Sequence, residues 1–119
     1  MPRLSTILLP TTSAAIDNVA YDVTGEKARG DGYYGFSDGL HTVAQFLTGF
    51  TGKIEIQGTL ALEPADADWI VLDTTEDTSS GAPGLTENRT FNFSGNYVWI
   101  RAVVTDITYG TITKIQMNH

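Results

Sequence analysis

The side chains best suited to chemistry in this sequence are its histidines and its clustered carboxylates. The chain has two histidines and no cysteine, and the histidines stand far apart, at His41 and His119. Nucleophilic catalysis requires a hydroxyl or thiol held against a base, and only Asp38 places a carboxylate close in sequence to an imidazole, at His41. A turn aspartate that caps local backbone is the preferred interpretation of Asp38. We therefore expect no enzymatic activity and no catalytic residue.

Acidic residues gather at 63–68 and 73–77, which raises the alternatives of a calcium site or of a carboxylate pair for glycoside hydrolysis. The spacing lacks the Asp-x-Asp/Asn-x-Asp/Asn-Gly core of an EF-hand loop, so solvated turns are preferred, with a structural Ca²⁺ left open. Two histidines distant in sequence and no thiolate predict no zinc site. No cofactor or metal is expected.

The charge balance limits the classes of partner. Fourteen acidic and seven basic side chains give a formal net charge of −7, which repels phosphate backbones and anionic lipid surfaces. Neither nucleic acid nor a membrane is therefore an expected partner. The apolar run before Pro10 is too short for a signal-peptide core or a membrane span, so we also expect no leader.

The elements that must position these side chains show the two-residue period of strands. Alternation is clearest at 96–106 and at 53–62, where one face of each segment is apolar. The predicted core positions are Ile54, Ile56, Gly58, Leu60, Leu62, Val98, Ile100, Ala102 and Val104. Further strands are predicted at 4–9, 15–23, 41–48, 68–74, 89–93 and 110–117.

The predicted fold is a single all-β domain over residues 1–119, an antiparallel, jelly-roll-like β-sandwich of about eight strands, with a closed barrel as the main alternative. Only one helical turn is indicated, at Pro64–Asp68. Regular alternation would place Ile112 and Ile115 on opposite faces of their strand, because they are three residues apart. This requires either a β-bulge between them or a strand covered on both faces. Residues 1–10 are interpreted as an N-terminal arm that reaches a neighbour or as an ordinary terminal strand.

Aromatic residues supply the candidate binding positions. Tyr97, Trp99 and Arg101 are predicted on the outer face of the strand at 96–106, and these residue types are enriched at interface hot spots. A second core layer within the domain is an equal alternative. Tyr33 and Tyr34, in a glycine-rich loop, either anchor that loop or present their rings to a partner.

Four stretches of the chain, GYYGFSDGLHTV at 32–43, FTGKIEIQGTL at 50–60, DW at 68–69 and GNYVWIRA at 95–102, together resemble a family of small virion structural proteins of tailed bacteriophages. The similarity is to large contractile-tailed phages of cyanobacteria and other marine hosts. It implies a component made in the host cytoplasm and assembled into a head, neck, tail or baseplate. Its partners would be other virion proteins and copies of itself.

A second hypothesis is a carbohydrate-binding module that attaches a virion to the host surface. Residues 50–101 are similar in layout to discoidin-like jelly rolls, which often bind sugars through loops at one end of the sandwich. Stacking of sugar rings on Tyr33, Tyr34 and Trp69 would carry that role.

Overall fold

The computed structural model describes residues 5–13, 22–35, 39–77 and 85–119. Asp38 and most of the predicted strand 15–23 lie outside these residues. The strands are β1 (Ser5–Leu9), β2 (Thr12–Ser13), β3 (Val23–Thr24), β4 (Ala28–Arg29), β5 (Leu40–Thr59), β6 (Ile70–Asp77), β7 (Leu85–Ser94) and β8 (Trp99–Asn118). Every strand pairing is antiparallel, so the predicted all-β class is confirmed. The helical elements of the described residues are single turns, α1 (Asp31–Tyr34) and η1 (Asp66–Asp68).

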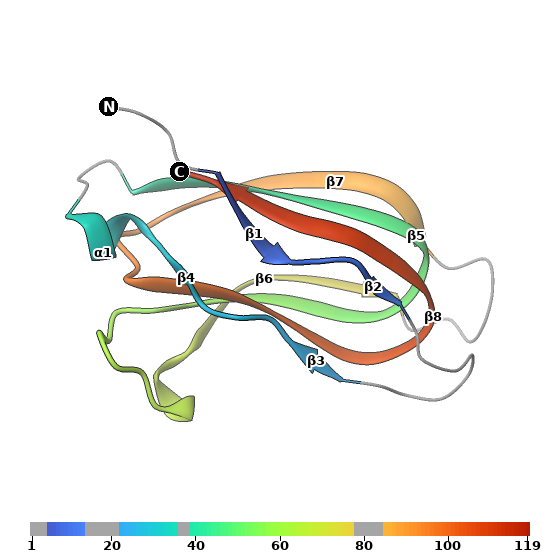
Figure 1. Ribbon diagram of the computed structural model, residues 1–119, viewed down its shortest axis with the longest axis horizontal. Helices are drawn as coiled ribbons and strands as arrows, with labels where there is room; N and C mark the ends of the chain where they lie inside the picture. The colour runs from blue at the N-terminus through green and yellow to red at the C-terminus, as the bar shows by residue number, and fades with distance from the viewer. Residues whose placement is uncertain (1–4, 14–21, 36–38, 78–84) are drawn as a thin grey trace.

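Two strands of 20 residues each, β5 and β8, pair with each other along nearly their whole length. Sequence patterning divided each of them into two strands. Figure 1 shows that both strands run toward one end of the molecule, bend there together and return in the other layer. The sandwich is therefore one sheet folded over on itself, and its two layers share the same two central strands.

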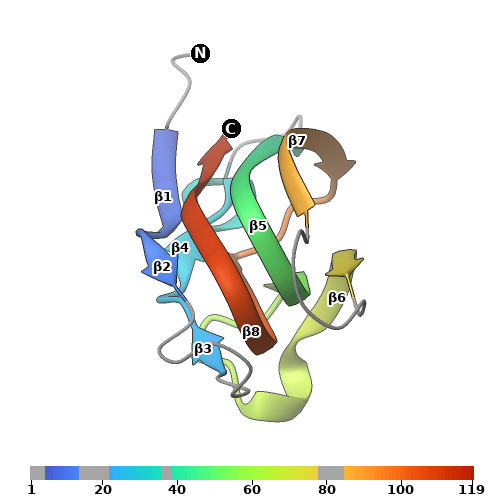
Figure 2. The same ribbon diagram turned by 90° about the vertical axis from the view of Figure 1, so that its right-hand side faces the viewer.

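The side strands complete each layer. In the first layer, residues 40–50 of β5 pair with β7, and residues 111–118 of β8 pair with β1 and β2. In the second layer, residues 52–58 of β5 pair with β6, and residues 99–104 of β8 pair with β3 and β4. Figure 2 shows β5 and β8 at the centre, with β1 to β3 on one side and β6 and β7 on the other.

The shared bend depends on residues with positive φ. Gly49 (φ 61°), Gly52 (φ 151°) and Gly110 (φ 84°) adopt conformations that side chains disfavour, and Asp106 (φ 55°) adopts the left-handed region on β8. A Cβ atom on Gly110 would overlap the Gly49 carbonyl, so the two strands also touch backbone to backbone there. Asp22 Oδ1 accepts a hydrogen bond of 2.9 Å from the Asp106 backbone N–H, which supports the turn from outside.

Between the layers lies a core of aliphatic side chains from both halves of β5 and β8, joined by Leu8 and Leu9 of β1 and by Phe50 at the bend. Leu60 and Leu62 were predicted in this core but are 67% and 69% exposed. The alternation stops because β5 ends at Thr59, where the chain turns toward η1. Ile112 and Ile115 are both fully buried, because a β-bulge at Thr113 changes the parity between the pairs Phe46–Lys114 and Leu47–Ile112.

The N-terminal segment is part of the sheet where the structure describes it. Residues 5–9 form β1 and pair with β8, so the free-arm interpretation is wrong for these residues, and residues 1–4 lie outside the described part. The predicted turn at Pro64–Asp68 corresponds to η1, whereas α1 was not predicted. Within the described residues no helix combines the length and the apolar character that crossing a bilayer requires.

Replacing Gly110 by Ala tests the bend. The variant must adopt positive φ and also displace the Gly49 backbone, so we expect a loss of about 3 kcal/mol in the free energy of unfolding. Gly35→Ala is the matched control, because Gly35 also has positive φ (74°) but an added Cβ would meet nothing within 4 Å. We expect about 1 kcal/mol for the control. Urea unfolding followed by circular dichroism measures both, and equal losses would mean that the strands are not in close contact at the bend.

Candidate functional site

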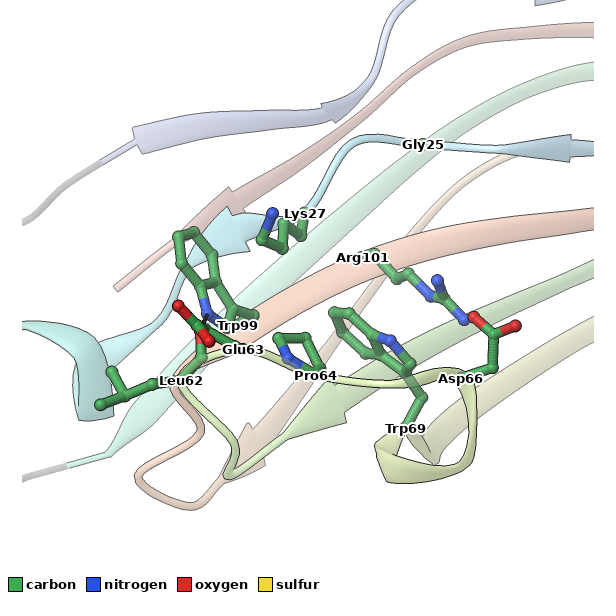
Figure 3. A pocket seen from close by; sticks show the side chains of 9 residues that line it. All are labelled: Gly25, Lys27, Leu62, Glu63, Pro64, Asp66, Trp69, Trp99 and Arg101. Atoms are coloured by element: carbon green, nitrogen blue, oxygen red, sulfur yellow. Dashed lines mark hydrogen bonds between the residues drawn. The ribbon is translucent and has the colours of Figure 1, made fainter.

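An open groove of about 630 Å³ lies on the outer face of the second layer, and we call it the tryptophan groove (Figure 3). Figure 3 shows the Trp99 indole near one end of the groove and the Trp69 indole nearer the other, with Pro64 between them. The residues that line it are Gly25, Lys27, Leu62, Glu63, Pro64, Asp66, Trp69, Trp99 and Arg101.

Strand alternation on β8 positions the floor of the groove. Trp99 and Arg101 alternate with the fully buried Ile100 and Ala102, so their side chains point out of the sandwich, as the sequence predicts. Trp69 directly follows η1, and the Asp68 carboxylate holds that turn by accepting a 2.8 Å hydrogen bond from the Ala65 backbone N–H. Both tryptophans of the chain therefore lie in this groove.

A cation lies over each indole, and hydrogen bonds fix Arg101 and the Trp99 indole in place. The Arg101 guanidinium lies 4.2 Å from the Trp69 ring centroid, and its Nε donates a 2.8 Å hydrogen bond to Gln57 Oε1. The Lys27 ammonium lies 4.8 Å from the Trp99 ring centroid, and the Trp99 indole N–H donates a 2.9 Å hydrogen bond to the Leu62 carbonyl. These contacts orient both rings before any ligand arrives.

Tyr33 and Tyr34 extend the same surface beyond the groove. The Tyr33 ring centroid lies 5.1 Å from that of Trp99 and 5.5 Å from that of Tyr34. Both tyrosines are about 40% exposed, and the Arg29 guanidinium lies 4.7 Å from the Tyr33 ring. The loop aromatics and the strand face, which the sequence presented as separate candidates, thus form one aromatic row of Tyr34, Tyr33 and Trp99.

Tyr97 does not belong to this surface. Its ring packs against the core and meets Phe93 edge to face, with 5.9 Å between ring centroids. A Cβ atom on Gly58 would come within 3.0 Å of the Tyr97 ring, so the absence of a side chain at Gly58 makes room for the tyrosine. The predicted outward position of Tyr97 is wrong because β8 begins only at Trp99, after the alternation has been broken.

The charges in the groove are mixed. Glu63 and Asp66 supply carboxylates, Lys27 and Arg101 supply cations, and Figure 3 shows the Arg101 side chain pointing toward the Asp66 carboxylate. Pro64 and the two indoles add apolar faces beside these charges. This arrangement is suited to recognition of a ligand with both apolar faces and polar groups.

A second cluster lies inside the sandwich, at the end opposite the bend, and sequence reasoning missed it. The buried side chains of Asp31, His41 and His119 have one potential ligand atom each, all within 4.8 Å of one another. The expectation that the two histidines are too far apart to share a site is wrong. Thr42 pairs with Asn118 across the sheet, which places the adjoining residues His41 and His119 beside each other. The available signal was that His41 begins the predicted strand 41–48 and His119 follows the predicted strand 110–117 by two residues, so antiparallel pairing would bring them together.

Comparisons with known proteins complete the description. No protein-family model matches the chain, and no curated protein matches it either. Among solved structures, one similar chain is CBM29_1, a family 29 carbohydrate-binding module from Piromyces equi. It has 7% sequence identity and a TM-score of 0.48, and the alignment covers 98% of this chain and 91% of the other. No ligand is transferred from it.

The substitution Arg101→Met tests the orientation of Trp69. It is made in a Trp99→Phe background, so that Trp69 is the only tryptophan left and tryptophan emission reports on it alone. Loss of the cation over the ring and of the hydrogen bond to Gln57 should increase acrylamide quenching of Trp69. The free energy of unfolding should fall by about 1 kcal/mol at most, because the contact is partly exposed. Lys114→Met is the matched control, since Lys114 lies 5.2 Å from the Phe46 ring and outside the groove. Unchanged quenching in the Arg101 variant would contradict the described contact.

Proposed function

We propose that this chain is a non-enzymatic structural component of a tailed-phage virion, which packs against neighbouring copies of itself through the tryptophan groove and the aromatic row. The described residues of the four stretches that resemble virion proteins lie on α1, on β5, at η1 and around the start of β8. The resemblance supports the assignment to a virion, and the groove supports packing between copies of the chain.

The observation that carries the proposal is the composition of the exposed surface. Trp, Tyr and Arg dominate interface hot spots because each buries a large area while keeping a polar group. Here Trp69, Trp99, Tyr33 and Arg101 share one face and are already oriented by their own contacts. Such preorganisation lowers the entropic cost of association.

Exposed aliphatic side chains border the same face. Leu62 lines the groove, Leu60 precedes it in the chain, and Ile70 directly follows Trp69; each is more than half exposed. Large apolar side chains gathered beside aromatic rings mark protein contact surfaces more often than free surface. These exposed side chains would add to the apolar area that packing against a neighbouring copy removes from water.

The edges of the sheet offer a second mode of contact between copies. Within the described residues β6 and β7 pair with β5 alone, so each has an outer edge without a strand neighbour. Identical subunits in symmetric arrays commonly meet through such edges or through sheet faces. The groove adjoins β6, because Trp69 immediately precedes Ile70.

Purified particles of the phage that encodes this chain test the virion assignment. We expect quantitative mass spectrometry to find the chain in the particles at a copy number that is a multiple of the local symmetry. Its absence from intact particles, while it is present in the infected cell, would contradict the proposal.

Trp99→Ala tests the packing surface. Removal of a central aromatic side chain should raise the dissociation constant of the homo-oligomer at least tenfold, as measured by sedimentation velocity. Phe46→Ala is the matched control, because Phe46 is an aromatic residue beside a cation but on the first layer. Thermal unfolding separates loss of association from loss of folding. A Trp99 variant that is folded and associates like the wild type would show that the groove is not the interface.

The aromatic row also favours a second candidate, a carbohydrate-binding module for host attachment. Three rings in succession, with centroids 5.1 and 5.5 Å apart, offer flat surfaces beside carboxylates and cations that can hydrogen-bond sugar hydroxyls. A glycan array followed by titration of tryptophan emission tests this role. Saccharide binding that Tyr34→Ala abolishes and Phe46→Ala retains would favour it, and no saccharide binding by the wild type would eliminate it.

A further inference from the structure

We propose that Asp31, His41 and His119 form an internal site for one divalent transition-metal ion of the Zn²⁺ type. The three residues come from separate elements: Asp31 begins α1, His41 is the second residue of β5, and His119 follows the end of β8. All three side chains are at least 97% buried, and they lie between the layers at the end of the sandwich. The metal site is independent of the proposed virion role and of the tryptophan groove.

Two hydrogen bonds determine the protonation state of His41. The Gly39 carbonyl can only accept, so His41 Nδ1 donates to it over 2.8 Å. The Asp31 backbone N–H can only donate, so His41 Nε2 accepts from it over 3.2 Å. His41 is thus a neutral imidazole whose Nε2 lone pair is directed into the cluster. Metal-binding histidines commonly have this arrangement, with the second ring nitrogen donating to a carbonyl.

Asp31 provides the negatively charged ligand. Its Oδ1 accepts a 2.6 Å hydrogen bond from His119 Nδ1 and lies 3.9 Å from His41 Nε2. Its Oδ2 is buried and has no hydrogen-bond partner among the residues that the structure describes. A buried carboxylate oxygen without a partner is costly, because burial removes the water that would otherwise solvate it. An ion bound between the three residues would satisfy this oxygen.

The donor set matches Zn²⁺ better than Ca²⁺ or Mg²⁺. Two imidazole nitrogens and one carboxylate are a common three-ligand set for zinc, which leaves a fourth position for water or another ligand. Calcium and magnesium prefer sites built from oxygen alone. Ligand atoms of a tetrahedral zinc ion lie about 3.3 Å apart. The three potential ligand atoms lie within 4.8 Å of one another, with separations of 2.6 and 3.9 Å to Asp31 Oδ1, so binding requires shifts of up to about 1.5 Å. Binding would replace the proton between Asp31 and His119 and lengthen the contact from the Asp31 backbone N–H.

Ring stacking fixes the positions of the two histidines. The His41 ring stacks on Phe93 at 4.7 Å and on His119 at 5.4 Å, and Tyr34 covers the outer side of His119 at 5.8 Å. Tyr34 is about 40% exposed, whereas both histidines are buried. A bound ion would tie the helical turn α1 to the ends of both long strands.

The test uses a metal-stripped chain of residues 1–119, titrated with ZnCl₂. We expect one ion per chain by calorimetry and a rise in Tm of about 5 °C or more at saturation. Because the chain has two histidines, ring ¹⁵N spectra report on this cluster alone, and both His41 Nε2 and His119 Nδ1 should shift on binding. Asp31→Asn should abolish the Tm response, while Glu76→Gln, an exposed carboxylate-to-amide change on β6, should retain it.

Several results would overturn the proposal. These are an equal response to MgCl₂ or CaCl₂, a Zn²⁺ response that persists in Asp31→Asn, and ¹⁵N shifts at neither or only one of the two histidines. If Asp31→Asn fails to fold, the Tm response of His119→Gln to Zn²⁺ and the ring ¹⁵N spectra of the wild-type chain take its place, and a Zn²⁺ response that persists in His119→Gln would contradict the site. A wild-type chain that shows no Zn²⁺ binding would identify the cluster as a hydrogen-bonded structural element only.

Discussion

The pairing of β5 with β8 is the interaction on which the rest of the structure depends. These strands run beside each other through both layers, and every other strand attaches to one of them. The bend that they share turns one ladder into two facing sheets, so the core exists because the pairing survives the bend. Glycines at 49, 52 and 110 make that possible, since they allow positive φ and close backbone approach where the register between the two strands shifts.

Both candidate sites follow from this pairing. The register that places Thr59 opposite Trp99 brings the end of β5 beside the start of β8, and the chain after Thr59 then forms the wall of the tryptophan groove. The register that places Thr42 opposite Asn118 brings His41 beside His119 at the other extremes of the same strands. One site faces outward and the other inward because strand residues alternate between the two faces of a sheet.

The sequence predicts the local parts of this structure and misses the parts set by distant contacts. Alternation at Ile54, Ile56, Ile100 and Ala102 correctly indicates an inner face, and Trp99 and Arg101 correctly point outward. Glycine normally marks the end of a strand, so a single strand that continues through Gly49 and Gly52 is not visible in local patterning. His41 and His119 are neighbours because strands far apart in the chain pair with each other. Composition and residue spacing do not predict which strands pair. Tyr97 was misplaced for a local reason, because alternation was extended two residues before the strand begins.

The sharing of β5 and β8 by both layers also determines the order in which this fold can be acquired. Residues 40–59 have no central partner until residues 99–118 have been synthesised, so neither layer can close on the nascent chain before the last strand emerges. Folds dominated by such distant pairings fold slowly, in the millisecond-to-second range, and they expose unpaired strand edges meanwhile. Because the two layers share β5, β8 and the core between them, we expect the layers to unfold in one cooperative transition.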